Sequence, residues 1–102
     1  MAAPAATSRS AWDDREVPTI SAFYGILIRM YFGDHPPPHF HVRYGEHKAR
    51  FEISSGELID GSVPPRAGRL VREWAALHED ELSENFRRCE QRLPLQPIEP
   101  LP

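Results

Sequence analysis

The hydrophobic pattern of this sequence changes its period once, at the adjacent prolines Pro64 and Pro65. Before them, apolar and polar residues alternate in short runs, which is typical of strands with one buried face. After them, apolar residues recur every three or four positions and predict one long amphipathic helix over about 65–91. Ser62 is a candidate N-cap, and Pro94 ends the helix because proline cannot continue it. A chain that contains both patterns in this order is expected to fold as an α+β protein.

Three runs in the first part of the chain predict strands, over 23–32, 39–44 and 48–54. The last two are joined by a short turn that contains Gly45, which favours a β-hairpin. A short fourth strand is expected over 58–60. We therefore expect a small antiparallel β-meander of three to four strands, packed on one long C-terminal helix in two layers.

The chain has 102 residues, which is enough for one small domain. We expect residues 18–102 to form a single α+β domain with an extended C-terminal tail, and residues 1–17 to be a disordered N-terminal arm without either period. The net charge of −3 confines any nucleic-acid site to a local basic patch. Cys89 is the only cysteine, which excludes an intramolecular disulfide and suits a reducing cytoplasm. No apolar run is long enough to span a membrane.

One helix can cover only one face of the predicted sheet, so the other face is either solvated or a functional site. This second face is expected to carry Arg29, Tyr31, His39, His41, Arg43, Lys48, Arg50 and Glu52. The two histidines follow three prolines, 36–38, which lack backbone donors and favour an extended connector. This stiff loop fixes where the next strand begins, and therefore the direction in which His39 and His41 point.

The first hypothesis for this face is a metal-independent ribonuclease. If the hairpin closes over 45–48, His41 lies opposite Glu52, which would orient it as a general acid and base, with His39 as its catalytic partner. A register slipped by two residues places Arg50 opposite His41 instead. The residues expected to bind phosphate or nucleic acid are Arg29, Arg43, Lys48, Arg50 and Tyr31. Binding of nucleic acid without catalysis would use the same face.

The second hypothesis is a metal site. Two imidazoles that leave one strand on the same side can share a zinc, copper or nickel ion, but they supply only two ligands. The candidate ligand set is His35, His39 and His41. Other candidates for the third ligand are Asp34, His47 and Glu52. Apart from this alternative, the sequence predicts no cofactor.

The third hypothesis is a non-enzymatic adaptor that docks a protein partner on the segment 37–42, "PPHFHV". Two reactive residue types on the apolar face of the predicted helix are assigned to the core. His78 is interpreted as a core histidine, and Cys89 as a buried thiol, because no neighbouring base or motif marks it as a nucleophile.

Three stretches of the sequence resemble a known family. They are "PTISAFYGILIRMYFGDHPPPHFHVRY", "GELIDGSVPPRAGRLVREWAALHEDEL" and "PLQPIEPL". Together they are similar to small prokaryotic proteins of the family named domain of unknown function 4160, from about Val17 to Leu101. The D-H-x-P-P-H-F-H-V stretch and the G-S-x-P-P-R-A helix start are its most distinctive motifs.

The resemblance implies a toxin-like component of a prokaryotic toxin–antitoxin module, because some members of the family are assigned as toxins encoded beside a small partner protein. It implies a cognate small antitoxin as partner and gives His39 and His41 as the matching motif positions, with Asp34 and His35 in the loop before them. Together with the first hypothesis, it predicts a cytoplasmic protein that acts on RNA. No membrane partner is expected, and an exposed sheet edge is compatible with a homodimer.

Overall fold

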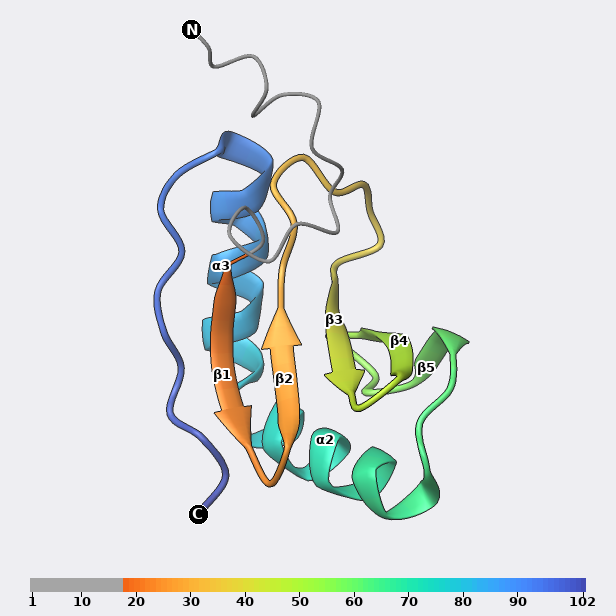
Figure 1. The fold of residues 1–102 in the computed structure, drawn as a ribbon. Coiled ribbons are helices and arrows are strands. Elements are labelled where there is room, and N and C mark those ends of the chain that lie inside the picture. Colours follow the sequence, from red (N-terminus) through yellow and green to blue (C-terminus); the bar gives the residue numbers. More distant parts are fainter. Residues whose placement is uncertain (1–17) are drawn as a thin grey trace, which may run out of the picture.

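The computed structural model describes residues 18–102 and contains a five-stranded antiparallel sheet and two helices in this range. The strands are β1 (Thr19–Phe23), β2 (Ile26–Arg29), β3 (His39–Tyr44), β4 (His47–Glu52) and β5 (Leu58–Gly61). They lie in the sheet in chain order, and the helices are α2 (Pro65–Leu77) and α3 (Glu79–Gln91) (Figure 1). The predicted α+β meander is therefore confirmed in outline. The predicted disordered arm, residues 1–17, lies outside the described residues.

The prediction of one strand over 23–32 is wrong, because a two-residue turn divides this run. Tyr24 and Gly25 connect β1 to β2 and have positive φ angles of 51° and 80°. A two-residue turn of this kind matches the right-handed twist of an antiparallel pair, and glycine adopts it without strain. The sequence misleads here because Phe23 and Tyr24 are typical strand residues. The first strand instead begins upstream of this run, at Thr19.

The prediction of one long helix is also wrong, because the helix is divided at His78 into α2 and α3, which run in different directions (Figure 1). An unbroken helix over 65–91 would be about 40 Å long, whereas a six-residue strand such as β3 extends only about 20 Å. The break lets both helices pack on the same core. Acidic residues in the first turn of α3, 79–81, favour a helix N-terminus there. Neither helix has the length and apolar content needed to cross a membrane.

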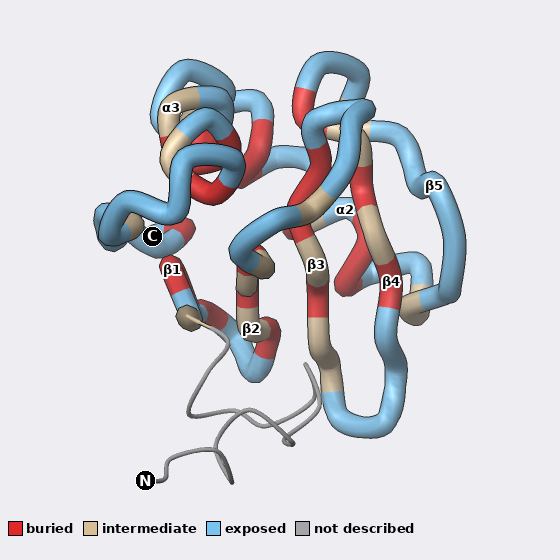
Figure 2. Tube along the Cα trace, turned by 90° about the horizontal axis from the view of Figure 1, so that it is seen from above, coloured by how far each residue is buried: buried red, intermediate tan, exposed pale blue. Residues whose placement is uncertain are grey.

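The core lies between one face of the sheet and the two helices. Buried and half-buried residues alternate along β2, in the middle of β3 and in the second half of β4 (Figure 2). Ile26, Ile28 and Met30 are buried, as the period-2 pattern predicted. Trp74 of α2 is fully buried, and its ring contacts Phe40 of β3 at a centroid distance of 5.8 Å. The helices thus attach to the sheet through large apolar side chains, whose burial stabilises the fold by about 1.5–3 kcal/mol each.

The C-terminal tail is extended, as expected, and hydrogen bonds to its backbone hold it to the core. The Asn85 amide donates to Gln96 O at 2.8 Å and accepts from Gln96 N–H at 2.9 Å. Trp74 Nε1–H donates to Glu99 O at 2.8 Å, and Ile98 N–H donates to a carbonyl of β1. The helices and the tail therefore contact one face and one edge of the sheet, and no other element among residues 18–102 covers the second face.

Replacement of Gly61 by alanine is expected to destabilise the protein by about 3 kcal/mol or more. Gly61 has a φ of +83°, and a Cβ atom there would lie 2.2 Å from Lys48 O and 2.7 Å from Ala49 Cα. These are backbone atoms of the neighbouring strand β4, so they cannot move aside without loss of β4–β5 pairing. Urea-induced unfolding followed by tryptophan fluorescence measures the change in the free energy of unfolding.

Gly45→Ala is the matched control. Gly45 also has a positive φ, of +59°, but a Cβ atom there would meet nothing within 4 Å. We expect a cost of only about 1–2 kcal/mol, from the left-handed backbone conformation alone. Equal losses of stability in the two variants would show that the close approach of β4 to Gly61 is not the cause.

Cys89 is expected to react with iodoacetamide far more slowly in the folded protein than in urea. The thiol is fully buried in α3, and burial, with a smaller effect from Asp34, raises its pKa to about 11. At pH 8 only about one thiol in a thousand is then ionised, against roughly a quarter for a free cysteine with a pKa near 8.5. Mass spectrometry of timed reactions gives both rates. Similar rates in the two conditions would mean that the thiol is accessible.

Candidate functional site

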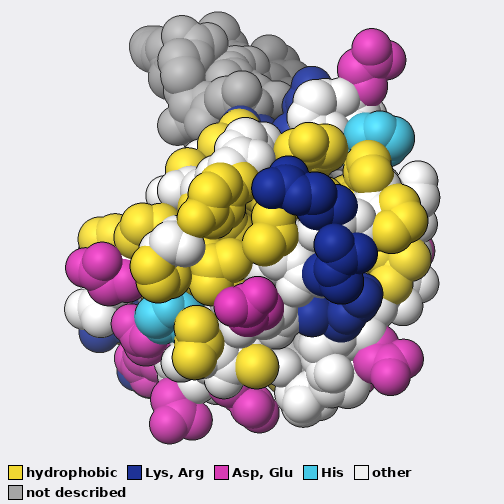
Figure 3. All heavy atoms as spheres, turned by 90° about the horizontal axis from the view of Figure 1, so that it is seen from below, with side chains coloured by type: hydrophobic (Ala, Val, Ile, Leu, Met, Phe, Trp, Pro, Cys, Tyr) yellow, Lys and Arg dark blue, Asp and Glu magenta, His cyan; other side chains and the backbone are white. Residues whose placement is uncertain are grey.

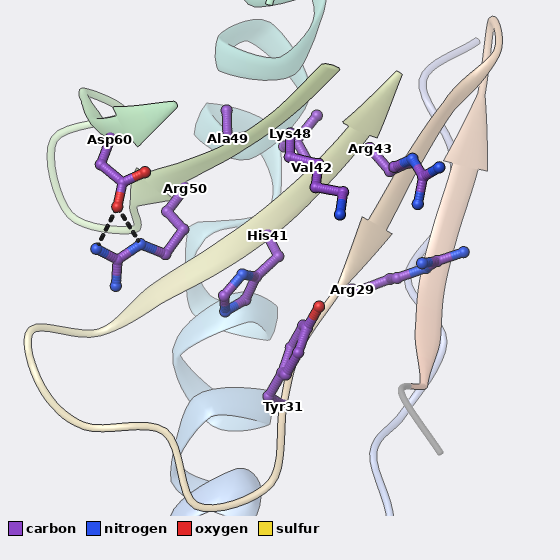
Figure 4. Close-up of a pocket in the computed structure, with 9 residues that line it drawn as sticks. All are labelled: Arg29, Tyr31, His41, Val42, Arg43, Lys48, Ala49, Arg50 and Asp60. Carbon is purple, nitrogen blue, oxygen red and sulfur yellow. Dashed lines mark hydrogen bonds and ion pairs between the residues drawn. The ribbon is translucent and has the colours of Figure 1, made fainter. Parts of the chain in front are cut away.

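A pocket of about 210 Å³ lies on the sheet face that is turned away from the helices (Figure 4). Strands β2, β3 and β4 supply most of its lining, because their side chains alternate between the core and this face. The lining residues are Arg29, Tyr31, His41, Val42, Arg43, Lys48, Ala49, Arg50 and Asp60. All five residues predicted to bind phosphate or nucleic acid thus lie in one cavity, together with His41. We call this cavity the cationic pocket.

Like charges face each other across the strands of the cationic pocket. Arg43 of β3 is directly opposite Lys48 of β4. His41 lies between Arg29 of β2 and Arg50 of β4 in the same cross-strand row. Opposite charges in such positions stabilise a sheet by roughly 0.2–1 kcal/mol per pair, whereas like charges destabilise it. This arrangement is unfavourable for folding alone and favourable for an anionic ligand.

Among the described residues that line the pocket, Asp60 is the only acidic one, and it fixes the position of Arg50. Arg50 Nε and Nη2 both donate to Asp60 Oδ2, at 3.1 Å and 2.6 Å (Figure 4). The guanidinium group has a further nitrogen whose donors this carboxylate does not use. Asp60 was not among the predicted site residues, because nothing in the sequence indicated that the short strand β5 would border the pocket.

The prediction that Glu52 orients His41 is wrong, because the hairpin has the other register. A two-residue turn at 45–46 joins β3 to β4, which places Glu52 opposite His39 instead of His41. Glu52 accepts a hydrogen bond from Ser55 Oγ at 2.6 Å and is absent from the pocket lining. The turn is two residues shorter than the sequence suggested, and this difference shifts every cross-strand partner by two positions.

Asp34 takes the place next to His41 that was predicted for Glu52. Its Oδ2 atom lies 2.9 Å from His41 Nε2 and 3.1 Å from His39 Nε2. His35, a member of the predicted metal-ligand set, is exposed and takes no part in this group. Successive side chains of an extended segment point to opposite sides, so the inward direction of Asp34 turns His35 outward. The aspartate had been considered only as one of several alternatives for a third ligand.

The loop that carries Asp34 is fastened at both ends by backbone hydrogen bonds. Gly33 N–H donates to Cys89 O of α3 at 3.2 Å, and Ile53 N–H donates to Pro38 O at 3.0 Å. The three prolines between these points restrict the backbone further. The position of the Asp34 carboxylate is therefore set by α3 and by the residue that follows β4, although Asp34 itself is in a loop.

His39 is much more buried than its place on the predicted open face suggested. Its side chain is 3% exposed, compared with 21% for His41. The ring lies 5.7 Å from that of Phe86, because α3 continues past the start of β3 and covers it. His39 Nδ1 is 2.7 Å from Pro37 O. A carbonyl oxygen only accepts, so Nδ1 carries a proton and donates it.

The charges of this cluster stabilise one another. Burial alone would raise the pKa of Asp34, but the contacts with His39 and His41 hold it well below its usual range. The nearby Asp34 carboxylate in turn raises the pKa of His39, against the opposite effect of burial. Asp34 is therefore ionised, and the space between the three side chains favours positive charge. Such a cluster can hold either a proton or a cation.

An aromatic surface completes the site. The ring of Tyr31 lies against that of His41, with a centroid distance of 4.1 Å, and both rings border the cationic pocket (Figure 4). The pocket therefore combines cations, which suit phosphate, with a ring of the kind on which nucleic-acid bases stack.

Comparison with known proteins identifies a family but no characterised relative. The family model described as domain of unknown function (DUF4160) matches residues 25–87. No curated protein and no solved structure matches the chain. The matched segment includes the whole lining of the cationic pocket, as well as Asp34 and His39. The chain therefore belongs to the DUF4160 family, as its motifs indicated.

Proposed function

We propose that the protein binds single-stranded RNA through the cationic pocket and acts as a toxin-like component of a prokaryotic toxin–antitoxin module. The observation that carries the RNA-binding part is the arrangement of like charges across β2, β3 and β4. Four cationic side chains and one carboxylate line the pocket, in a chain whose net charge is −3. A phosphodiester seated among them relieves their mutual repulsion, and this electrostatic contribution dominates most binding of nucleic acids.

The size of the pocket favours part of a strand over a whole small-molecule ligand. Its volume of about 210 Å³ is below the roughly 300–1,000 Å³ that is usual for small-molecule sites. One nucleotide unit of a longer strand fits this description, with the neighbouring units outside. Tyr31 supplies a ring for a base, and unstacked bases are available in single-stranded RNA but not in a duplex.

The toxin-like role is supported by the family resemblance, and the charge of the pocket suits the proposed partner as well. A small antitoxin with an acidic segment would complement the same cations and block access of RNA. This role places the protein in the cytoplasm, where RNA and antitoxin are found together.

Replacement of two pocket cations, as Arg43→Gln/Lys48→Gln, is expected to weaken RNA binding by roughly tenfold or more. Each lost phosphate contact should also lower the slope of log Kd against log salt by about one. Fluorescence anisotropy of a short labelled single-stranded RNA, recorded at several salt concentrations in buffer with a chelator, measures both quantities. Urea unfolding of the variant checks that its stability stays close to that of the wild type.

The matched control removes two positive charges from another surface. Helix α2 carries the exposed residues Arg66 and Arg69, and basic side chains also gather on the face seen from the α2 side (Figure 3). Arg66→Gln/Arg69→Gln should bind RNA almost as the wild type does. If this control loses as much affinity as the pocket variant, or if the pocket variant binds normally, the cationic pocket is not the RNA site.

Inducible expression in a bacterial host tests the toxin-like role. We expect the wild-type protein to arrest growth and Arg43→Gln/Lys48→Gln to leave it unaffected, because the variant has lost contacts with its target. Growth curves and immunoblots for protein level give the comparison. Arrest by both proteins would separate toxicity from the pocket, and normal growth with abundant soluble wild-type protein would contradict the toxin role.

A further inference from the structure

Three side chains of metal-binding type meet at the end of the cationic pocket. Asp34, His39 and His41 each offer one possible ligand atom, and these three atoms lie within 4.8 Å of one another. The first comes from the loop before β3, and the other two come from β3 itself. They form the only group of three such residues in the range 18–102.

The His39 ring is oriented with its lone pair toward the other two side chains. Because Nδ1 carries the proton that is donated to Pro37 O, a neutral ring leaves Nε2 as an acceptor. Backbone carbonyls orient metal-binding histidines in this way, which fixes the tautomer and directs the free nitrogen at the ion. The orientation results from the stiff proline loop, which places the Pro37 carbonyl beside the start of β3.

The His39 Nε2 atom is buried and lacks a hydrogen-bond partner among the described residues. Asp34 Oδ2 is 3.1 Å away and forms an ion pair with the ring when the ring is protonated, but the two atoms do not form a hydrogen bond. Buried polar atoms without a partner are uncommon, because leaving one unpaired costs about 1–3 kcal/mol. The His39 side chain is only 3% exposed. A cation that faces both Nε2 and the Asp34 carboxylate would give this atom a partner.

We infer that Asp34, His39 and His41 bind a divalent transition-metal ion of the zinc type. Two imidazoles and one carboxylate are ligands that Zn²⁺ accepts, and hard ions such as Mg²⁺ and Ca²⁺ prefer oxygen. Zinc bonds of about 2.0–2.2 Å in a tetrahedron separate ligand atoms by about 3.4 Å. The two oxygen–nitrogen distances of 2.9 Å and 3.1 Å therefore have to widen by roughly 0.5 Å and 0.3 Å. His41 binds through Nε2 after its proton moves to Nδ1.

Three protein ligands leave one position of a tetrahedral ion open. His41 belongs to both the metal site and the cationic pocket, so the open position is next to the pocket lining. A phosphate oxygen can occupy it, and only this last step rests on the proposed RNA binding. The metal site itself depends on its three ligands alone, and it differs from the expectation of a metal-independent ribonuclease.

Isothermal titration of the untagged, chelator-treated full chain with ZnCl₂ alone, near neutral pH, tests the inference. We expect one Zn²⁺ per chain and no heat with MgCl₂. Asp34→Asn and His39→Gln should each weaken zinc binding by roughly 10–100-fold or more. His35→Gln, which removes the exposed neighbouring histidine, should bind as the wild type does. Substitution with Co²⁺ should give the strong visible absorption of a four-coordinate ion in the wild type and lose it in Asp34→Asn.

The inference is overturned if the folded wild-type chain takes up no zinc, or if His35→Gln abolishes binding while Asp34→Asn and His39→Gln retain it. Asp34 is partly exposed, so its variant keeps the test valid if the buried His39 variant does not fold. The RNA measurement is made with a chelator, and the zinc measurement is made without RNA. The two proposals are therefore tested independently, and failure of one does not decide the other.

Discussion

Helices and tail cover only one of the two faces that the five-stranded sheet creates. Alternation along the strands sends Ile26, Ile28 and Phe40 toward α2 and α3, and it sends their neighbours to the opposite side. Apolar burial therefore stabilises the fold entirely from one side. The side chains of the second face do not have to pack in the core, so they can be charged. Arg43 can lie opposite Lys48 because the repulsion between them is small compared with the stabilisation that the core provides.

The site also requires a loop whose position is fixed by contacts with other parts of the chain. The segment between β2 and β3 has no regular structure, yet hydrogen bonds to Cys89 of α3 and to Ile53 fix its two ends. Its prolines remove most of the remaining freedom. Asp34 consequently meets His41 at a defined distance, while α3 shields His39 from solvent. The break in the helix at 78 contributes to this arrangement, because it lets α3 run toward the start of β3.

Properties that depend on local period could be predicted from the sequence, and properties that depend on register or distant contacts could not. The period of two was enough to place the five predicted phosphate-binding residues on one face, where one pocket now contains them. The cross-strand partner of His41 depends on whether the hairpin turn has two residues or four. Both turn lengths leave every side chain on the same face of the sheet, so the alternation could not distinguish them. The contact between Asp34 and His41 depends on the path of a loop across α3, and no pattern in the sequence of the loop predicts that path. The turn at Tyr24–Gly25 and the helix break at His78 were missed for a related reason, since neighbouring residues favoured continuation.

The two proposed sites share His41, and this has a thermodynamic consequence. An ion held by Asp34, His39 and His41 adds positive charge at the end of a pocket that is already cationic, so it increases the attraction of that pocket for phosphate. By linkage, a phosphate-bearing ligand must strengthen ion binding by the same factor. The Asp34 carboxylate moderates this coupling, because it neutralises part of the charge of the ion. With two neutral imidazoles the cluster carries only the negative charge of Asp34, and a bound divalent ion makes its net charge positive, which adds to the attraction of the pocket for anions.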